Sequence, residues 1–171
     1  MTSLQPTTGV WQHRASNFLD SYVAVDPTSF ELLCVRVASR SLPCVVTVVY
    51  RPGSVAVSIT FSVEMSDGLE RLSTFMEPVF VVGDVNVYLE RSNDLAAREL
   101  IEYFADHGLL NWVSSPAHDH GGMLDIVVGR SDLPVPRVHV VDFCLSDHRM
   151  LRWLVPMTRE IPVYVSTSYL P

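Results

Sequence analysis

Polar residues that could support chemistry stand beside apolar runs of the chain, where the backbone holds a side chain firmly and a ligand can still reach it. Asp84 and Asn86 follow the apolar run 79–82, and their spacing lets both side chains face one side of an extended chain. There a carboxylate can hold a water molecule or a metal ion, and an amide can donate to a phosphate oxygen. An Asx-type turn after a strand explains the same spacing, so the pair alone leaves both interpretations open.

Three further groups have the same character. Asp125 lies in the apolar run 124–128 and, if buried, needs a partner such as histidine. Asp147 and His148 are adjacent between two apolar segments, a pairing found both in catalytic or metal sites and in plain polar turns. Tyr50 closes a β-branched run, where its phenol could donate to a phosphate or simply be half-buried. Their joint meaning depends on the elements that carry them.

Those elements follow from the apolar patterns and from the turn-forming residues between them. The expected strands are 30–37, 44–50, 79–82, 124–128, 138–141 and 150–155, and the expected helices are 66–76, or from an earlier start, and about 93–107. Ser66 or Asp67 would cap the first helix, and Asn93 or Asp94 the second. The order predicts a mixed α/β domain with helices packed on a largely β framework.

The composition fits one domain of ordinary size with a real core, since the chain has 171 residues, 48% of them hydrophobic and 18% charged. Its net charge of -7 speaks mildly against a free-standing nucleic-acid binder and suits carboxylates gathered around a divalent cation. Every basic residue is Arg, which suits phosphate oxygens, although a bias in composition explains this more simply.

Cys34, Cys44 and Cys144 lie in apolar runs without zinc-type spacing, which predicts small core residues in a reducing compartment. Residues 1–10 lack the apolar stretch of a signal peptide, and the longest apolar run is far too short for a membrane span. We therefore expect an intracellular protein, nuclear or cytoplasmic, that is neither secreted nor bound to a membrane.

Four motifs, taken in chain order over about residues 30–155, resemble the second half of the endonuclease/exonuclease/phosphatase superfamily. They are Tyr50 followed by Pro52, Gly83-Asp84-Val85-Asn86, Leu124-Asp125, and Ser146-Asp147-His148. Within the superfamily, further segments resemble the endonuclease of non-LTR retrotransposons. They are the Tyr-Arg-Pro-Gly stretch 50–53, the helical segment 69–73, and the Pro-Ala-His segment 116–118 ahead of Gly121.

The resemblance implies an α/β (α+β) fold, part of a four-layer α/β sandwich of two packed mixed sheets flanked by helices. It assigns residues 30–156 to the C-terminal part of that domain, 1–29 to an irregular lead-in and 157–171 to a tail. The family's first strands, with their Asn and metal-binding Glu, have no counterpart before residue 30, so the N-terminal strands are expected to be missing. A chain truncated in this way is expected to bind Mg²⁺ weakly and to cleave poorly.

The resemblance also implies metal-dependent phosphodiester hydrolysis, with Mg²⁺ (or Mn²⁺) as cofactor. Asp84 would orient or activate the attacking water. Asn86 would stabilise the crowded, negatively charged transition state, and Asp147 would lie close to the metal.

The remaining implied roles concern the phosphate. His148 would contact it, and Asp125 would bond the other ring nitrogen of His148, fixing its tautomer and favouring the imidazolium. Tyr50 would hydrogen-bond the phosphate. His118 and Arg51 are candidates for substrate binding, although a plain solvated loop histidine explains His118 more simply.

Three functions fit these expectations. The first is a DNA-nicking endonuclease whose 3′ hydroxyl primes reverse transcription; its partners would be DNA and a missing N-terminal segment or reverse-transcriptase portion of the same element. The second is a phosphatase on the same fold acting on a small phosphoester. The third is an inactive retrotransposon remnant, so the sequence leaves open whether the chain is an enzyme.

Overall fold

The computed structural model describes residues 26–37, 43–118, 121–134, 136–142 and 147–154. In chain order the elements are β1 (Glu31–Val37), β2 (Cys44–Tyr50), α1 (Ile59–Ser73), β3 (Val79–Asp84), α2 (Leu95–Asp106), β4 (Leu109–Asn111), β5 (Asp125–Arg130), β6 (His139–Val141) and β7 (Met150–Arg152). The expected tail and nearly all of the expected lead-in lie outside the described residues, as do Cys144 and Ser146.

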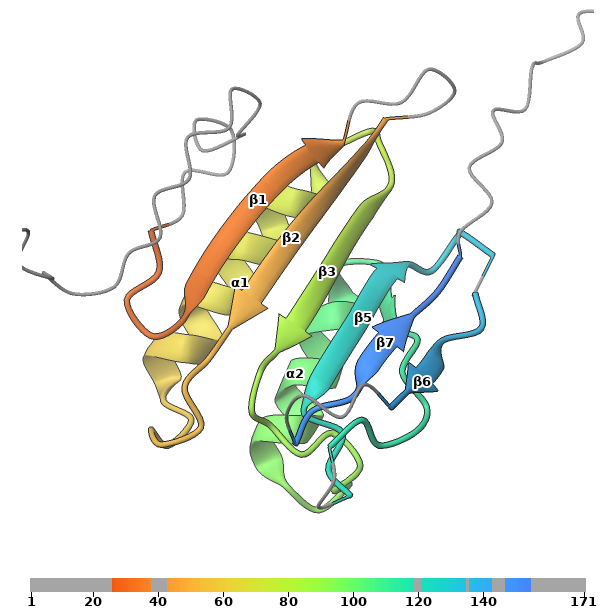
Figure 1. The fold of residues 1–171 in the computed structure, drawn as a ribbon. Helices are drawn as coiled ribbons and strands as arrows, with labels where there is room; N and C mark the ends of the chain where they lie inside the picture. Colours follow the sequence, from red (N-terminus) through yellow and green to blue (C-terminus); the bar gives the residue numbers. More distant parts are fainter. Residues whose placement is uncertain (1–25, 38–42, 119–120, 135, 143–146, 155–171) are drawn as a thin grey trace, which may run out of the picture.

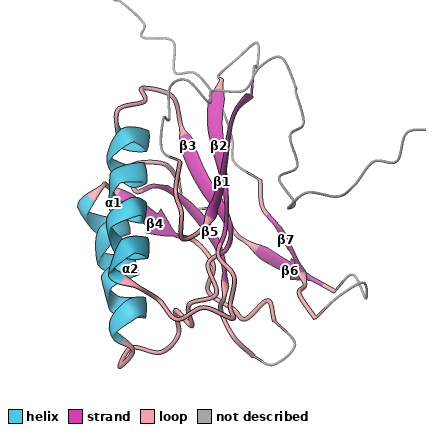
Figure 2. Ribbon diagram, turned by 90° about the vertical axis from the view of Figure 1, so that its left-hand side faces the viewer, coloured by secondary structure: helices cyan, strands magenta, loops and turns pink. Residues whose placement is uncertain are grey.

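Three layers stack in the described part of the chain. A five-stranded sheet has the order β1-β2-β3-β5-β4, and β6 and β7 form a second, two-stranded sheet (Figure 1). Helices α1 and α2 lie on one face of the larger sheet, and the small sheet lies on the other (Figure 2). The larger sheet is mixed, since β2 and β3 are parallel whereas β1–β2 and β3–β5 are antiparallel. This arrangement confirms the predicted α/β sandwich fold.

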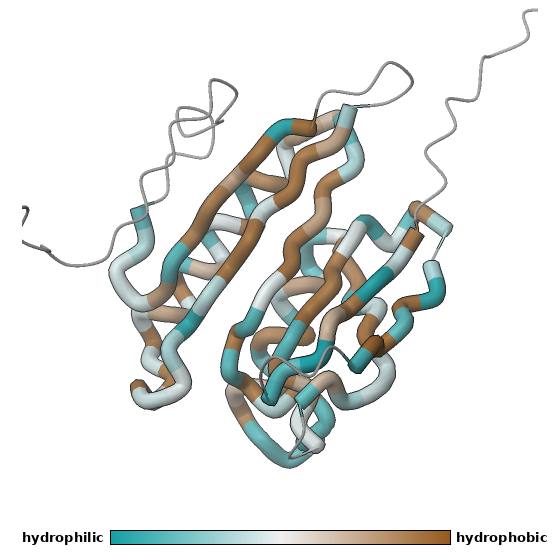
Figure 3. The backbone as a smooth tube through the Cα atoms, in the orientation of Figure 1, coloured by the Kyte–Doolittle hydropathy of each residue, from teal (hydrophilic) through white to brown (hydrophobic). Residues whose placement is uncertain are grey.

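The strands of the larger sheet are largely hydrophobic (Figure 3). Their alternation places an apolar layer of side chains on each face of the sheet. Toward the helices, Val45 and Val49 of β2 belong to a core that includes Leu69 of α1 and Leu100 of α2. On the opposite face a second cluster gathers around Phe80, Trp112, Val113 and Val127, and Val138, Leu151 and Trp153 from the small sheet and its flanks pack against it. The small sheet is thus fixed to the larger one by apolar packing.

Helix α1 begins earlier than the residues favoured as its cap. Ser58 is the N-cap, and its hydroxyl oxygen accepts a hydrogen bond from the Phe61 backbone N–H at 3.2 Å. The expected caps Ser66 and Asp67 lie inside the helix, so that prediction was wrong. The buried series Phe61, Met65 and Leu69 shows why, because its spacing of four residues continues the apolar stripe two turns upstream.

Helix α2 agrees with its prediction more closely. Asp94 is the N-cap and accepts a hydrogen bond from the Ala96 backbone N–H at 2.9 Å. Gly108 follows the helix with a φ of 66°, a left-handed conformation that glycine adopts without strain. Strand β4 starts directly after it and was not predicted, because three residues are too few to show a strand period. Among the described residues, no helix has the length and apolar character needed to cross a membrane.

Candidate functional site

A row of polar side chains crosses one end of the larger sheet. Tyr50 is the register partner of Asp84 across β2 and β3, and Asp84 is the partner of Asp125 across β3 and β5. Glu31 of β1 is paired with Tyr50 and extends the row. The side chains of register partners point to the same face of a sheet. Asp84 lies an even number of residues beyond Phe80 in β3, so its side chain shares a face with that of Phe80, which packs toward the small sheet. The row therefore faces the side of the small sheet.

The backbone at the end of β3 brings Asp84 and Asn86 together. Asn86 has a φ of 48°, a left-handed conformation that asparagine tolerates better than most residues. Its side-chain amide donates to Asp84 Oδ2 at 2.7 Å and to the Arg51 carbonyl at 2.8 Å. The Asn86 backbone N–H donates to Asp84 Oδ1 at 2.9 Å. Both predicted residues are thus locked to each other and to the end of β2.

Gly83 lies within β3, although the sequence suggested that the strand ends there. Its φ is 134°, and a Cβ at this position would come within 2.0 Å of the Val49 carbonyl oxygen. A glycine is therefore required for β2 and β3 to approach each other at this point. The strand consequently continues to Asp84 and delivers its carboxylate to the end of the sheet.

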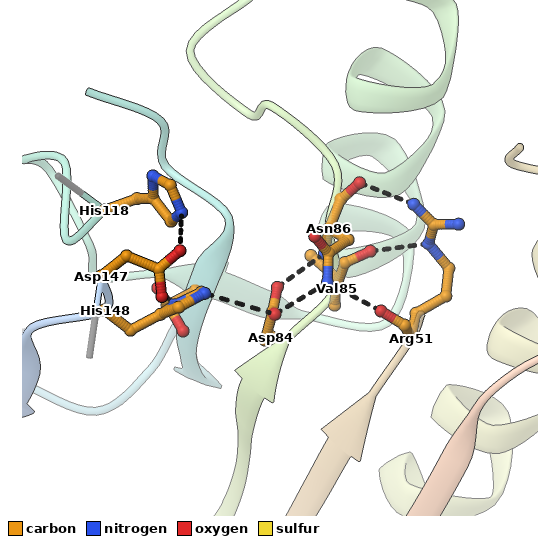
Figure 4. Close-up of polar contacts among 8 residues, drawn as sticks. Arg51, Asp84, Val85, Asn86, His118, Asp147 and His148 are labelled. Carbon is orange, nitrogen blue, oxygen red and sulfur yellow. Dashed lines mark hydrogen bonds and ion pairs between the residues drawn. The ribbon is translucent and has the colours of Figure 1, made fainter. Parts of the chain in front are cut away.

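Arg51 has a different place from the one expected. It is only 4% exposed, and its Nε donates to the Val85 carbonyl at 2.7 Å. Its terminal nitrogens donate to the carbonyls of Val55 and Asn86, both at 2.6 Å. Figure 4 shows the contacts with Val85 and Asn86. A guanidinium engaged in this way has little capacity left for a phosphate, which is at odds with the expected substrate contact. Arg51 instead braces the loops after β2 and β3.

His148 joins the row from the loop before β7. Its Nδ1 lies 3.0 Å from Asp125 Oδ2, within hydrogen-bond distance, and its Nε2 lies 3.9 Å from Asp84 Oδ2. Because Nδ1 faces a carboxylate, it carries the proton, and Nε2 is directed toward Asp84. The predicted pairing of His148 with Asp125 is therefore present in the geometry, although they are separated by more than twenty residues in the sequence.

His118 lies next to His148, on the segment that precedes β5. The two residues form an isolated antiparallel β-bridge, and their rings meet edge to face with centroids 4.8 Å apart. His118 Nε2 is 3.3 Å from Asp147 Oδ2, while the Asp147 side chain is 62% exposed. Figure 4 shows these three side chains beside Asp84, so these four residues come from three separate segments of the chain. Asp119 and His120 lie outside the described residues.

The surroundings shift the acidity of two groups in the site. Burial raises the pKa of Asp84, and the nearby Asp125 charge adds to this, although the hydrogen bonds from Asn86 and the His148 charge oppose it. Burial alone would lower the pKa of His148, but the hydrogen bond and charge of Asp125, with the charges of Asp84 and Asp147, outweigh it and raise the pKa. The site thus combines a more basic carboxylate with an imidazole that favours its cationic form.

Oxygen and nitrogen ligands for a metal ion are both present. The carboxylates of Asp84, Asp125 and Asp147 surround His148, and carboxylate oxygens are the ligands that Mg²⁺ prefers. His118, Asp147 and His148 also bring three ligand atoms within 4.8 Å of one another. The residues present therefore fit a divalent cation at this end of the sheet.

A shallow hollow adjoins the site and contains residues that sequence patterns did not single out. His118 and Arg149 line it together with Ser115, Pro116, Gly121, Val140 and Asp142. The Arg149 backbone N–H donates to the Ala117 carbonyl at 2.7 Å, which ties the segment after His148 to the segment before His118. Tyr50, at the other end of the row, is 46% exposed.

Comparisons with known proteins identify the family of the chain and support its fold. Residues 5–148 match the Endonuclease/Exonuclease/phosphatase family. No curated protein sequence matches the chain significantly. Among solved structures, the endonuclease domain of TRAS1, a telomere-specific non-LTR retrotransposon, superposes with a TM-score of 0.59 at 15% identity, over 75% of this chain and 63% of that domain. The chain thus spans less than two thirds of that domain.

Two more distant structural matches have TM-scores below 0.5. A family protein from Leptotrichia buccalis gives 0.49 at 11% identity, over 73% of this chain and 53% of the other. The catalytic domain of Xenopus laevis APE2 gives 0.42 at 15% identity, over 84% and 62%. On the family match, which covers most of its length, the chain belongs to the endonuclease/exonuclease/phosphatase family.

Proposed function

We propose that this chain carries the phosphate-handling part of a metal-dependent phosphodiesterase that nicks DNA. The observation that carries the proposal is the joint placement of the Asp125–His148 pair and the Asp84–Asn86 pair at one end of the sheet. The resemblance of several motifs and of the fold to a non-LTR retrotransposon endonuclease supports DNA as the substrate. The nick would supply a 3′ hydroxyl for reverse transcription.

The geometry suggests how these residues would share the work. Asp84, with its raised pKa, would accept a hydrogen bond from the attacking water and orient it. The His148 imidazolium would donate to phosphate oxygens that gain charge as the reaction proceeds. Asn86, whose two amide hydrogens are donated to Asp84 and to the Arg51 carbonyl, would hold the Asp84 carboxylate in position. Asp125 would hold the His148 ring in one orientation through Nδ1. Tyr50, half-exposed in the same row, would donate its phenolic proton to the phosphate.

A divalent cation, Mg²⁺ or Mn²⁺, would be held by Asp147 with help from the neighbouring carboxylates. When bound, such an ion neutralises charge on the phosphate and on the leaving oxygen. His118 would lie on the substrate side, at the edge of the hollow that also contains Arg149.

One observation favours a second candidate, hydrolysis of a small phosphoester. The net charge of -7 disfavours long-range attraction of a polyanion. Two of the arginines that could have offset it are engaged elsewhere, because Arg51 is buried and Arg130 is paired with Asp132 at 2.6 Å. This excess of negative charge over available arginines suits a substrate with one phosphate better than a DNA duplex.

Supercoiled plasmid incubated with Mg²⁺ tests the proposal. The wild-type chain should convert it to the nicked circle slowly, because the expected truncation weakens Mg²⁺ binding, and His148→Asn should abolish this conversion. His107→Asn is a matched control, because His107 lies at the end of α2 and its Nδ1 is 2.8 Å from the Tyr103 carbonyl. Hydrolysis of a small phosphoester without nicking would favour the second candidate. Equal nicking by wild type and His148→Asn would contradict both.

A further inference from the structure

His118, Asp147 and His148, called the histidine cluster from here on, have a donor set that differs from an all-oxygen magnesium site. Two of the three ligands are imidazoles. Imidazole nitrogen suits zinc and other first-row transition ions, whereas Mg²⁺ binds oxygen and gives up its water reluctantly. The cluster therefore raises the question of which divalent ion it selects.

The spacing of the ligands suits a tetrahedral ion. Zinc lies about 2.0–2.2 Å from nitrogen and oxygen ligands, so neighbouring ligand atoms are roughly 3.3–3.5 Å apart. His118 Nε2 and Asp147 Oδ2 are already 3.3 Å apart. All three ligand atoms lie within 4.8 Å of one another, so His148 needs only a small movement to complete the set. A water molecule would complete a four-coordinate set from the solvent side, where the Asp147 side chain is exposed.

The support around the histidine cluster also fits a metal site. Asp125 Oδ2 lies 3.0 Å from His148 Nδ1, which leaves Nε2, on the side of Asp84, as the ring nitrogen available to an ion. A carboxylate behind a metal-binding imidazole fixes its tautomer and increases its basicity as a ligand. The β-bridge between His118 and His148 fixes their two segments side by side. The exposed Asp147 gives an ion a route from solvent.

We propose that the histidine cluster is a binding site for a zinc-type transition-metal ion, distinct in its nitrogen ligands from the Mg²⁺ of the proposed hydrolysis. An ion bound there would occupy His148 Nε2, the atom that would otherwise donate to the phosphate. Zinc would therefore arrest nicking. This consequence rests on the proposed function, whereas the binding site itself does not.

Calorimetric titration with Zn²⁺, and the visible absorption of bound Co²⁺, test the site without measuring activity. The wild-type chain should bind one Zn²⁺, and excess Mg²⁺ should not displace it. His118→Asn should remove the tetrahedral Co²⁺ band. Asp125→Asn, which removes no direct ligand, should weaken Zn²⁺ binding roughly 10–100-fold. His107→Asn should leave binding unchanged, because that side chain lies at the end of α2.

Several outcomes would overturn the site. The site would be rejected if the folded wild-type chain bound no Zn²⁺, if wild type and His118→Asn bound Zn²⁺ equally well, or if Mg²⁺ displaced the bound Zn²⁺. If His118→Asn lowers the melting temperature, Asp147→Asn gives the same comparison at an exposed ligand. Plasmid nicking with and without Zn²⁺ is measured in an experiment separate from the metal-binding titrations. Nicking with Mg²⁺ in a chain that binds no Zn²⁺ would reject the zinc site and leave the proposed function standing.

Discussion

Replacing Arg51 by Met separates the two roles that sequence and structure give to this residue. Met preserves much of the apolar packing against Phe61, whose ring centroid lies 5.6 Å from the Arg51 guanidinium carbon. It removes three hydrogen bonds of 2.6 to 2.7 Å to the carbonyls of Val55, Val85 and Asn86. The loops after β2 and β3 then lose their common brace.

The magnitude follows from those three bonds. Each hydrogen bond from a charged donor contributes about 1.5–3 kcal/mol. Water can replace the bond to the exposed Val55 loop, so the other two bonds lead us to expect that Arg51→Met lowers the unfolding free energy by about 3–6 kcal/mol. For a chain of this size the melting temperature should fall by roughly 6–24 °C. Arg51→Lys should lose an intermediate amount, because one ammonium cannot span the same carbonyls as the planar fork.

Urea unfolding, with Arg98→Met on the exposed face of α2 as matched control, measures the effect. Nicking by the folded Arg51→Met chain should fall mainly in kcat, because Asn86 loses its support while the phosphate contacts remain. A variant with unchanged stability and a raised KM would instead assign Arg51 to the substrate and refute the bracing role.

Three further changes test other parts of the structure. Partial burial opposes ionisation of Glu64, but hydrogen bonds from the hydroxyls and backbone N–H groups of Thr28 and Ser29 outweigh it and lower the pKa to about 2. The stabilisation that results from this lowered pKa is fully present at pH values above about 4.3, the pKa of Glu in the unfolded chain, and is lost as the pH falls toward 2. After a discount for its exposure, Glu64→Gln should lower the unfolding free energy by about 1–2 kcal/mol at pH 7. In urea unfolding, the difference in free energy between the variant and wild type should become smaller below about pH 4. A difference that stays constant with pH would contradict the assignment. Gly83→Ala places a methyl group against the Val49 carbonyl and should lower the unfolding free energy by more than about 3 kcal/mol. Gly68→Ala, whose new methyl group would have no atom within 4 Å, should be neutral or stabilising. Equal effects of the two substitutions on urea unfolding would refute the close approach of β2 and β3. Tyr50→Phe should change the unfolding free energy by less than about 0.5 kcal/mol, because the side chain is half-exposed. The same substitution should reduce the rate of nicking several-fold. An unchanged rate of nicking would show that Tyr50 does not belong to the site.

The sequence predicted the elements with strong periods. Helix α2 and its cap Asp94 are confirmed, and the β-branched runs form β1, β2, β3 and β5 close to their expected ranges. The start of α1 was misplaced because Ser66 and Asp67 are good capping residues, and the buried contacts of Phe61 and Met65 decide the actual start. Strand β4 depends on its pairing with β5, which no local pattern reports.

For the candidate site, the sequence motifs gave the residue types but not their arrangement. Asp84 and Asn86 are close in sequence, so their contact could be anticipated. The contact between Asp125 and His148 depends on how the loop before β7 returns to the sheet, and it was expected only from the resemblance. Arg51 was assigned to the substrate because its type suits phosphate. In the structure, the bend after β3 turns the carbonyls of Val85 and Asn86 toward it, and the loop after β2 adds the carbonyl of Val55.

In the proposed function, Asp125 acts through His148 within a single phosphate site. A double-mutant cycle on plasmid nicking, with Asp125→Asn, His148→Asn and the double variant, tests this most directly. The structure predicts that Asp125→Asn reduces kcat in the wild-type background and causes almost no further loss once His148 is replaced. Losses that multiply in the double variant, or no Mg²⁺-dependent nicking by the folded wild-type chain, would contradict the account.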